Sequence, residues 1–261
     1  MDQDLDEVQS NLNDYQELLQ SEVYVDLDRL RILARQGVPH QIRGEVWKYL
    51  LGVQQADRSK ELSNTKERSE EYDQIDKTDP DVAKRIRGEV NRFQRKVREL
   101  QGKHYAEEFE NVILAYLNTN REIEYSPAMV SLCAPFIYCL EKECDAYYCF
   151  ERMMKAIDEE VDLNEWATSW LQNLLSKEMQ FDDLLRLWDA YFAIADPLEF
   201  HPFICLSILR NAKENLEDLE QSEIRTVLLR LPNMNMRMII AEAVNLRHES
   251  LERQMSEESD L

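Results

Sequence analysis

One stretch decides the fold of this chain: Gly37-Val38-Pro39-His40-Gln41-Ile42-Arg43-Gly44-Glu45-Val46-Trp47-Lys48-Tyr49-Leu50-Leu51-Gly52. Its first three residues form a strong helix stop, because glycine closes a helix and proline does not continue it. Asp26 provides a cap for the preceding helix, which we expect to start near Leu27. A second helix is predicted from about His40 to Gly52, where apolar side chains recur at helical spacing.

The composition extends this helical pattern to the whole chain. Its 261 residues allow one large or two small domains, and 44% hydrophobic residues are enough for a sizeable core. There are only five glycines and seven prolines, and the abundant residues are good helix formers. We therefore predict an all-α fold with no substantial β-sheet. Further helices are expected over residues 82–100, 105–117, 127–140, 144–157, 181–192, 203–215, 223–231 and 234–246, with another segment around Trp166 and Trp170.

Charge and cysteine content exclude several classes of function. The net charge of −21 argues against nucleic acid or an anionic membrane as the main partner, and it suits a protein with a basic surface. No apolar run approaches the roughly 18–20 residues that span a bilayer, and the acidic start MDQDLDEVQS is unlike a signal or transit peptide. Five cysteines without a matching histidine cluster favour buried, reduced thiols in a cytoplasmic protein and no metal site.

Three segments flank or interrupt the helical core. Leu5, Val8, Leu12, Tyr15 and Leu19 form an apolar stripe in an N-terminal extension, residues 1–24. This stripe predicts a helix packed on the domain, with a helix that dimerises or binds a further protein subunit as the alternative. Residues 54–80 are highly charged and predict a mobile linker or a loosely attached helix, and residues 249–261 predict a disordered acidic tail.

The helix over residues 82–100 is basic in an otherwise acidic chain. Its charges are either a solvated face balanced by acidic neighbours or a surface that meets phosphate or an acidic protein. The basic residues are Lys84, Arg85, Arg87, Arg92, Arg95, Lys96 and Arg98. The four scattered histidines and the lack of a glycine-rich phosphate loop disfavour an enzyme with its own small-molecule pocket.

Three motifs together resemble TBC domains, the GTPase-activating domains that act on Rab-family GTPases. The Gly37–Gly52 stretch resembles their opening motif, a Gly-(Ile/Val)-Pro turn followed by Arg-x-x-x-Trp. Leu184-Leu185-Arg186-Leu187-Trp188-Asp189 resembles the late Arg-(Leu/Ile)-Trp-Asp motif, and Ile86-x-x-Glu89-x-x-Arg92 resembles the Ile-x-x-Asp-x-x-Arg finger motif. The resemblance implies a helical TBC domain of two subdomains over residues 25–248.

The family's mechanism uses two side chains, and this chain keeps one of them. In active TBC domains an arginine neutralises charge on the γ-phosphate, and a glutamine from a Tyr-x-Gln-Gly-Met motif orients the attacking water. Arg92 matches the arginine, with Glu89 as its support. In Tyr125-Ser126-Pro127-Ala128-Met129 the outer residues match, but Pro127 replaces the glutamine and offers neither an amide nor an N–H. Pro127 instead suits the first turn of the following helix.

The resemblance also implies a partner and a binding groove. The partner would be a Rab-type GTPase that carries GTP and Mg²⁺ itself, so the chain needs no cofactor of its own and would reach membranes only peripherally. The expected groove residues are Arg43, Trp47, Ile86, Met129, Arg186, Trp188 and Asp189, although both tryptophans also suit a core. Two features depart from the family pattern: Phe93 follows the arginine where the family often has threonine, and the segment 155–165 is short, so a helix is expected to be missing there. The alternative function is a non-catalytic scaffold that uses the TBC fold to bind a GTPase or another protein.

Overall fold

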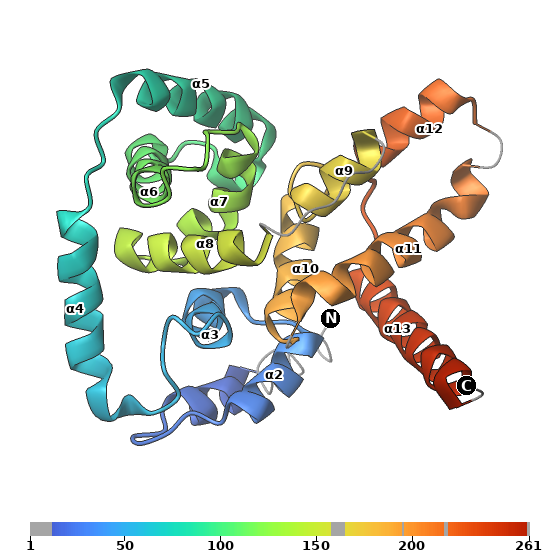
Figure 1. Ribbon diagram of the computed structural model, residues 1–261, viewed down its shortest axis with the longest axis horizontal. Helices are drawn as coiled ribbons and strands as arrows, with labels where there is room; N and C mark the ends of the chain where they lie inside the picture. The colour runs from blue at the N-terminus through green and yellow to red at the C-terminus, as the bar shows by residue number, and fades with distance from the viewer. Residues whose placement is uncertain (1–11, 158–164, 195, 217–218, 260–261) are drawn as a thin grey trace. The chain divides into compact units, whose positions relative to one another are not determined.

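The computed structural model describes residues 12–157, 165–194, 196–216 and 219–259 (Figure 1). Within these ranges the secondary structure is helical, apart from an isolated antiparallel bridge between Tyr24 and Asp57. The chain forms two compact units, residues 1–158 and 159–261. The predicted all-α fold with two helical subdomains is therefore confirmed.

The Gly37–Gly52 stretch folds as its sequence indicates. Helix α2, Leu27–Gln36, is capped by Asp26, whose carboxylate accepts hydrogen bonds from two backbone N–H groups of the first turn. Gly37 ends α2 with a φ of 112°, a backbone conformation that favours glycine. A 3₁₀ turn, His40–Ile42, then leads into α3, Arg43–Leu50.

A second glycine of this stretch lets two helices meet. A Cβ atom built on Gly44 would lie 2.2 Å from the carbonyl oxygen of Cys139, at the end of α7, Ala128–Cys139. Any larger residue would therefore push α3 away from α7. Beside this contact Trp47 packs edge-on against Phe136, with ring centroids 5.7 Å apart and both side chains fully buried. The opening motif is thus a packing motif of the first unit.

The described part of the N-terminal extension lies against the first unit. Residues 12–19 are helical, and Tyr15 is fully buried with its hydroxyl donating to the Gly37 carbonyl oxygen at 3.1 Å. This arrangement agrees with the favoured prediction of a helix packed on the domain. Leu5 and Val8 of the predicted stripe lie outside the described residues.

The charged segment 54–80 contains a packed helix rather than a mobile linker. A 3₁₀ turn, Arg58–Lys60, precedes α4, Glu61–Gln74. Tyr72 is buried and its hydroxyl donates to Glu143 at 2.7 Å, while the Tyr148 hydroxyl contacts Glu71 at 3.2 Å. One buried tyrosine and two tyrosine hydroxyl groups hold this helix on the unit. Because these are few contacts, a composition poor in large apolar residues does not reveal that the helix is attached.

Four further helices complete the first unit around a common apolar interior (Figure 1). They are α5, Pro80–Lys96, α6, Ala106–Thr119, α7, and α8, Glu143–Ile157, with a 3₁₀ turn, Arg98–Leu100, after α5. Asp79 caps α5 and Pro80 occupies its first turn, where a missing N–H costs nothing. The predicted boundaries of these helices are confirmed to within a few residues.

The second unit contains α9, Glu165–Gln172, α10, Phe181–Phe192, α11, Pro197–Leu216, α12, Gln221–Leu228, and α13, Met236–Ser259. Helices α11 and α13 pack against one another. The prediction of a disordered tail is wrong for residues 249–259, because good helix formers continue α13 and His248 contacts Glu252 one turn later at 3.2 Å. The segment in which a helix was expected to be missing falls largely on residues 158–164, outside the described residues.

No helix in the described part of the chain is both long and apolar enough to cross a lipid bilayer. Within the same residues, no group of three or more histidine, cysteine or acidic side chains is arranged to hold a metal ion. Cys133 and Cys149 are buried, and burial raises the pKa of the Cys133 thiol well above its usual value.

Candidate functional site

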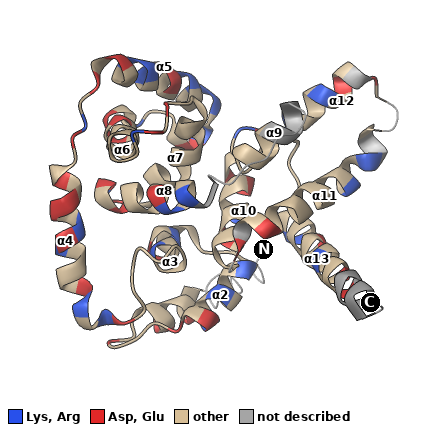
Figure 2. Ribbon diagram, viewed as in Figure 1, with Lys and Arg blue, Asp and Glu red and all other residues tan. Residues whose placement is uncertain are grey.

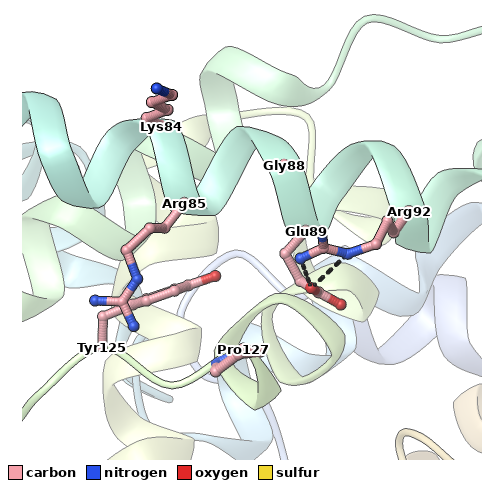
Figure 3. A pocket seen from close by; sticks show the side chains of 7 residues that line it. All are labelled: Lys84, Arg85, Gly88, Glu89, Arg92, Tyr125 and Pro127. Atoms are coloured by element: carbon pink, nitrogen blue, oxygen red, sulfur yellow. Dashed lines mark hydrogen bonds and ion pairs between the residues drawn. The ribbon is translucent and has the colours of Figure 1, made fainter.

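A pocket of about 330 Å³ lies between α5 and the segment that leads into α7 (Figure 3). It brings together the Ile86–Arg92 motif and the Tyr125–Met129 motif, which are distant in the sequence. Its lining residues are Lys84, Arg85, Gly88, Glu89, Arg92, Tyr125 and Pro127. Four of the eleven predicted site residues therefore share one pocket.

Helix α5 presents its charged residues to this pocket because its other face is apolar. Ala83, Ile86 and Val90 are buried and recur at spacings of three and four, which fixes the rotation of the helix on the unit. Glu89 then lies at the edge of the buried stripe, and Arg92 lies on the exposed face. Packing of this apolar stripe on the unit thus directs Arg92 outward.

Arg92 is exposed, and among the described residues its side chain is paired with Glu89. Its side chain is 65% exposed, and Nε and Nη2 donate to the same Glu89 carboxylate oxygen at 3.0 and 2.5 Å (Figure 3). A helix pair of this spacing contributes only about 0.2–0.5 kcal/mol. Glu89 therefore orients Arg92 without preventing the arginine from turning to a partner.

Pro127 forms the start of a helix at the glutamine position, as the sequence indicates. Its φ of −55° and ψ of −23° are helical, and it occupies the capping position of α7. Ser126 completes the turn, with its carbonyl oxygen accepting from Met129 N at 3.0 Å and its hydroxyl accepting from Ala128 N at 3.3 Å. The exposed Pro127 ring gives the pocket an apolar edge with no hydrogen-bond donor.

Tyr125 forms the floor of the pocket beside Arg85. The Arg85 guanidinium carbon lies 4.9 Å from the centroid of the Tyr125 ring, a cation–π contact (Figure 3). The Tyr125 hydroxyl is buried and has no hydrogen-bond partner among the described residues. Burial, followed by the negative charge of Glu89, raises the pKa of Tyr125.

Sequence reasoning missed three residues of the pocket: Lys84, Arg85 and Gly88. Lys84 and Arg85 were part of the basic cluster, but nothing in that cluster distinguished them from the other cations of α5. The available signal was the helical period, because Arg85 lies seven residues before Arg92 and so shares its face. The proximity of Tyr125 depends on tertiary packing.

The other predicted residues of the first unit support the fold away from the pocket surface. Trp47 and Ile86 are fully buried and Met129 is 3% exposed, so in this structure their side chains are core groups that a partner does not reach. Arg43 donates from Nη2 to the Val38 carbonyl oxygen at 2.8 Å and braces the Gly-Val-Pro turn.

Arg186, Trp188 and Asp189 lie on α10 in the second unit. Trp188 and Asp189 are fully buried, and the Trp188 indole donates to the Leu174 carbonyl oxygen at 3.4 Å, while Arg186 is half-buried. Trp188 and Asp189 therefore belong to the interior of their own unit.

The fold and the pocket define a class of protein: an all-helical domain with an exposed arginine in a basic pocket. The family comparison identifies the domain. The model of the Rab-GTPase-TBC domain family matches residues 40–159 and 155–217, more than half of the chain, and the chain belongs to this family. The two matched segments overlap at residues 155–159, within the segment where the sequence departs from the family pattern.

Similar proteins and structures agree with this assignment. The chain is 22% identical to the GTPase-activating protein gyp1 of Schizosaccharomyces pombe, a match that covers 80% of the chain and 54% of gyp1. It is 23% identical to human TBC1 domain family member 22A over 91% of the chain and 60% of that protein. The chain thus spans about half to three fifths of the length of these relatives.

The crystal structure of the Ypt/Rab-GAP domain of Gyp1p matches with a TM-score of 0.79, covering 93% of this chain and 99% of that one at 17% identity. The TBC domain of a Chlamydomonas flagellar RabGAP matches with a TM-score of 0.63 and 16% identity, covering 91% of this chain and 93% of that one. At such low identity these structures establish that the fold is shared.

Proposed function

We propose that this TBC domain binds a Rab-type small GTPase and accelerates its GTP hydrolysis with a single finger, Arg92. The observation that carries the proposal is the position of Arg92, exposed and held by one weak ion pair in the pocket where the two motif segments meet. GTP and Mg²⁺ belong to the partner. A cytoplasmic domain of this kind would reach membranes through the GTPase it binds.

The energetics favour release of Arg92 from Glu89 when a partner arrives. An arginine supplied in trans is worth about 10³–10⁵ in the rate of GTP hydrolysis, or about 4–7 kcal/mol. The exposed pair with Glu89 contributes about 0.5 kcal/mol or less. Stabilisation of the γ-phosphate charge therefore outweighs the lost ion pair by a wide margin, and Glu89 serves to hold Arg92 near its working position.

The attacking water needs a second group, and Pro127 does not provide one. Proline has no amide side chain and no backbone N–H with which to orient water. Hydrolysis would then depend on the partner's own glutamine, as it does in other GTPase systems. We therefore expect acceleration to be weaker than that of a two-finger domain.

The second candidate function is a non-catalytic scaffold that binds the GTPase without changing its hydrolysis rate. Pro127 favours this alternative, because it removes half of the two-finger chemistry while leaving the fold intact. Both functions predict binding, so only hydrolysis and binding measured together distinguish them.

The test is a panel of Rab GTPases loaded with GTP, in which binding and single-turnover hydrolysis are measured with and without this domain. For a GTPase that responds, Arg92→Ala should abolish the acceleration, a drop of about 10³-fold or to the intrinsic rate if acceleration is smaller. The matched control is Arg95→Ala, which removes another exposed arginine of α5 from outside the pocket.

The outcomes separate the two functions. Acceleration that persists in Arg92→Ala contradicts the finger assignment. Binding without acceleration by the unmodified domain supports the scaffold and contradicts catalysis. Failure to bind any member of the panel contradicts both.

A further inference from the structure

The pocket is positively charged in a strongly acidic chain. Its lining includes three cations, Lys84, Arg85 and Arg92, and one carboxylate, Glu89. Residues 80–103 contain eight basic and three acidic side chains, whereas the whole chain has a net charge of −21. Figure 2 shows this basic character along α5. Such a local field attracts an anionic group of a partner to this pocket.

The arginines of α5 differ in what holds them. Arg87 is paired with Glu110 through two hydrogen bonds, and Arg92 is paired with Glu89. Arg85, by contrast, has no carboxylate partner within the described residues, although it is exposed and lies in the pocket. The face of the Tyr125 ring holds it instead, at 4.9 Å. A cation–π contact orients a guanidinium group and leaves its N–H donors available.

Arg85 and Arg92 meet different parts of a partner. Seven residues separate them on α5, so they share a face but lie roughly 10 Å apart along the helix axis. Figure 3 shows the Arg85 side chain directed over Tyr125, whereas Arg92 turns toward Glu89. If Arg92 meets the γ-phosphate, a second group must face Arg85. A planar guanidinium with several donors fits a carboxylate in a two-point contact.

We infer that Arg85, oriented by the Tyr125 ring, is a specificity residue that binds a carboxylate side chain on the surface of the partner GTPase. This inference rests on the proposed function. It assigns Arg85 to partner affinity, while Arg92 acts on the chemical step. A charge-assisted hydrogen bond of this kind changes affinity about 10- to 100-fold when its donor is removed.

The test uses a Rab GTPase that the unmodified domain binds, loaded in turn with GDP and with a non-hydrolysable GTP analogue. Arg85→Ala should raise the Kd about 10- to 100-fold in both nucleotide states, because a surface carboxylate is present in both. Single-turnover hydrolysis at saturating domain should remain at the unmodified rate. The salt dependence of the Kd should also become shallower. The matched control, Arg95→Ala, should bind like the unmodified domain.

Variants of Tyr125 test the orienting role of the ring. Tyr125→Phe keeps the ring and removes a hydroxyl without a hydrogen-bond partner in the described structure, so the Kd should be unchanged. Tyr125→Leu removes the ring and should weaken binding by less than Arg85→Ala does. The double variant Arg85→Ala with Tyr125→Leu should bind no more weakly than Arg85→Ala alone, because the ring acts through the arginine.

Three results would overturn the inference while leaving the proposed function intact: an unchanged Kd for Arg85→Ala, a loss restricted to the GTP-analogue form, or a fall in the saturated hydrolysis rate. The second and third would place Arg85 on the nucleotide phosphates. If the unmodified domain binds no GTPase in either state, the proposed function fails and this inference fails with it.

Discussion

Two helices of this chain each have an arginine and a carboxylate three residues apart, in opposite surroundings. On α5, Arg92 is 65% exposed and pairs with Glu89 at the edge of a pocket. On α10, Asp189 is fully buried three residues after Arg186, and Trp188 between them is fully buried as well. Equal spacing thus gives a surface group available to a partner in one unit and a core element in the other.

The difference shows that burial, rather than spacing, assigns the role. An exposed pair contributes a few tenths of a kcal/mol, so its residues are available for binding and catalysis at little cost to the fold. A buried carboxylate or tryptophan makes many contacts that the fold depends on. Substitutions on α5 should therefore change activity, and substitutions on α10 should change stability.

The largest expected effect on stability is on α10. Trp188→Ala should lower the free energy of unfolding by about 3–5 kcal/mol, because a fully buried indole is replaced by a cavity. Trp188→Phe is the matched control and should cost less, since a ring remains to pack against Phe192. Chemical denaturation measures both. A cost for Trp188→Ala of 1 kcal/mol or less would show that α10 is not the core element described above.

The next largest effect is a pH dependence of the free energy of unfolding, which arises from His201 in the second unit. His201 is buried, and burial lowers its pKa to about 4, while its ring nitrogens contact Tyr191 and the Trp170 carbonyl oxygen. The unfolded state binds a proton below a pKa of about 6.5, so stability is full above that value and falls as the pH drops toward 4. We expect a loss of about 2 kcal/mol between pH 7 and pH 5.

Denaturation curves at the two pH values measure this loss. His201→Gln should reduce the pH dependence, although it should also lower stability at pH 7 because it disturbs buried hydrogen bonds. An identical slope in the unmodified protein and this variant would show that another group titrates.

A smaller effect is expected at the glutamine position. Pro127→Gln combined with Ala128→Gly should change the rate of stimulated GTP hydrolysis by less than about tenfold, or about 1.4 kcal/mol. The backbone there is already the first turn of α7, with Ser126 completing the turn, so a glutamine side chain would start from a different position. A gain of a hundredfold or more in single-turnover assays would show that only the side chain was missing.

The smallest expected effect on stability is on α5, and it tests the comparison of α5 with α10 directly. Arg92→Ala should change the free energy of unfolding by no more than about 0.5 kcal/mol, because it removes only an exposed helix pair. Thermal and chemical denaturation check this, with Arg95→Ala as the matched variant. A cost near that of Trp188→Ala would mean that Arg92 supports the fold, and the finger assignment would lose its basis.

Local signals in the sequence predicted most of the helices. The Asp26 cap and the Gly37-Val38-Pro39 stop act within a few residues, so they can be recognised without the fold. Predictions based on composition alone were less successful. For residues 54–80 the composition left a mobile linker and a loosely attached helix open, and residues 61–74 form a helix that Tyr72 and its distant partner Glu143 hold. For residues 249–259 it predicted disorder, but these residues continue α13.

The sequence motifs likewise predicted some of the site residues correctly and others not. The motif order indicated Arg92, Glu89, Tyr125 and Pro127, and all four line one pocket. It also suggested Trp47, Ile86, Trp188 and Asp189 as contact residues, although their side chains are buried. The helical period places Arg85 on the same face as Arg92, but its contact with the Tyr125 ring follows only from tertiary packing.

The sequence by itself determined that α2 begins after Asp26 and ends at Gly37, that an arginine follows Ile86 and Glu89 at helical spacing, and that position 127 has no side-chain amide. These are properties of single residues and of neighbours within one or two helical turns. The tertiary structure alone decided which charged groups are exposed and which segments share a pocket. Burial and pocket formation depend on contacts between residues far apart in the chain, and no local pattern records those contacts.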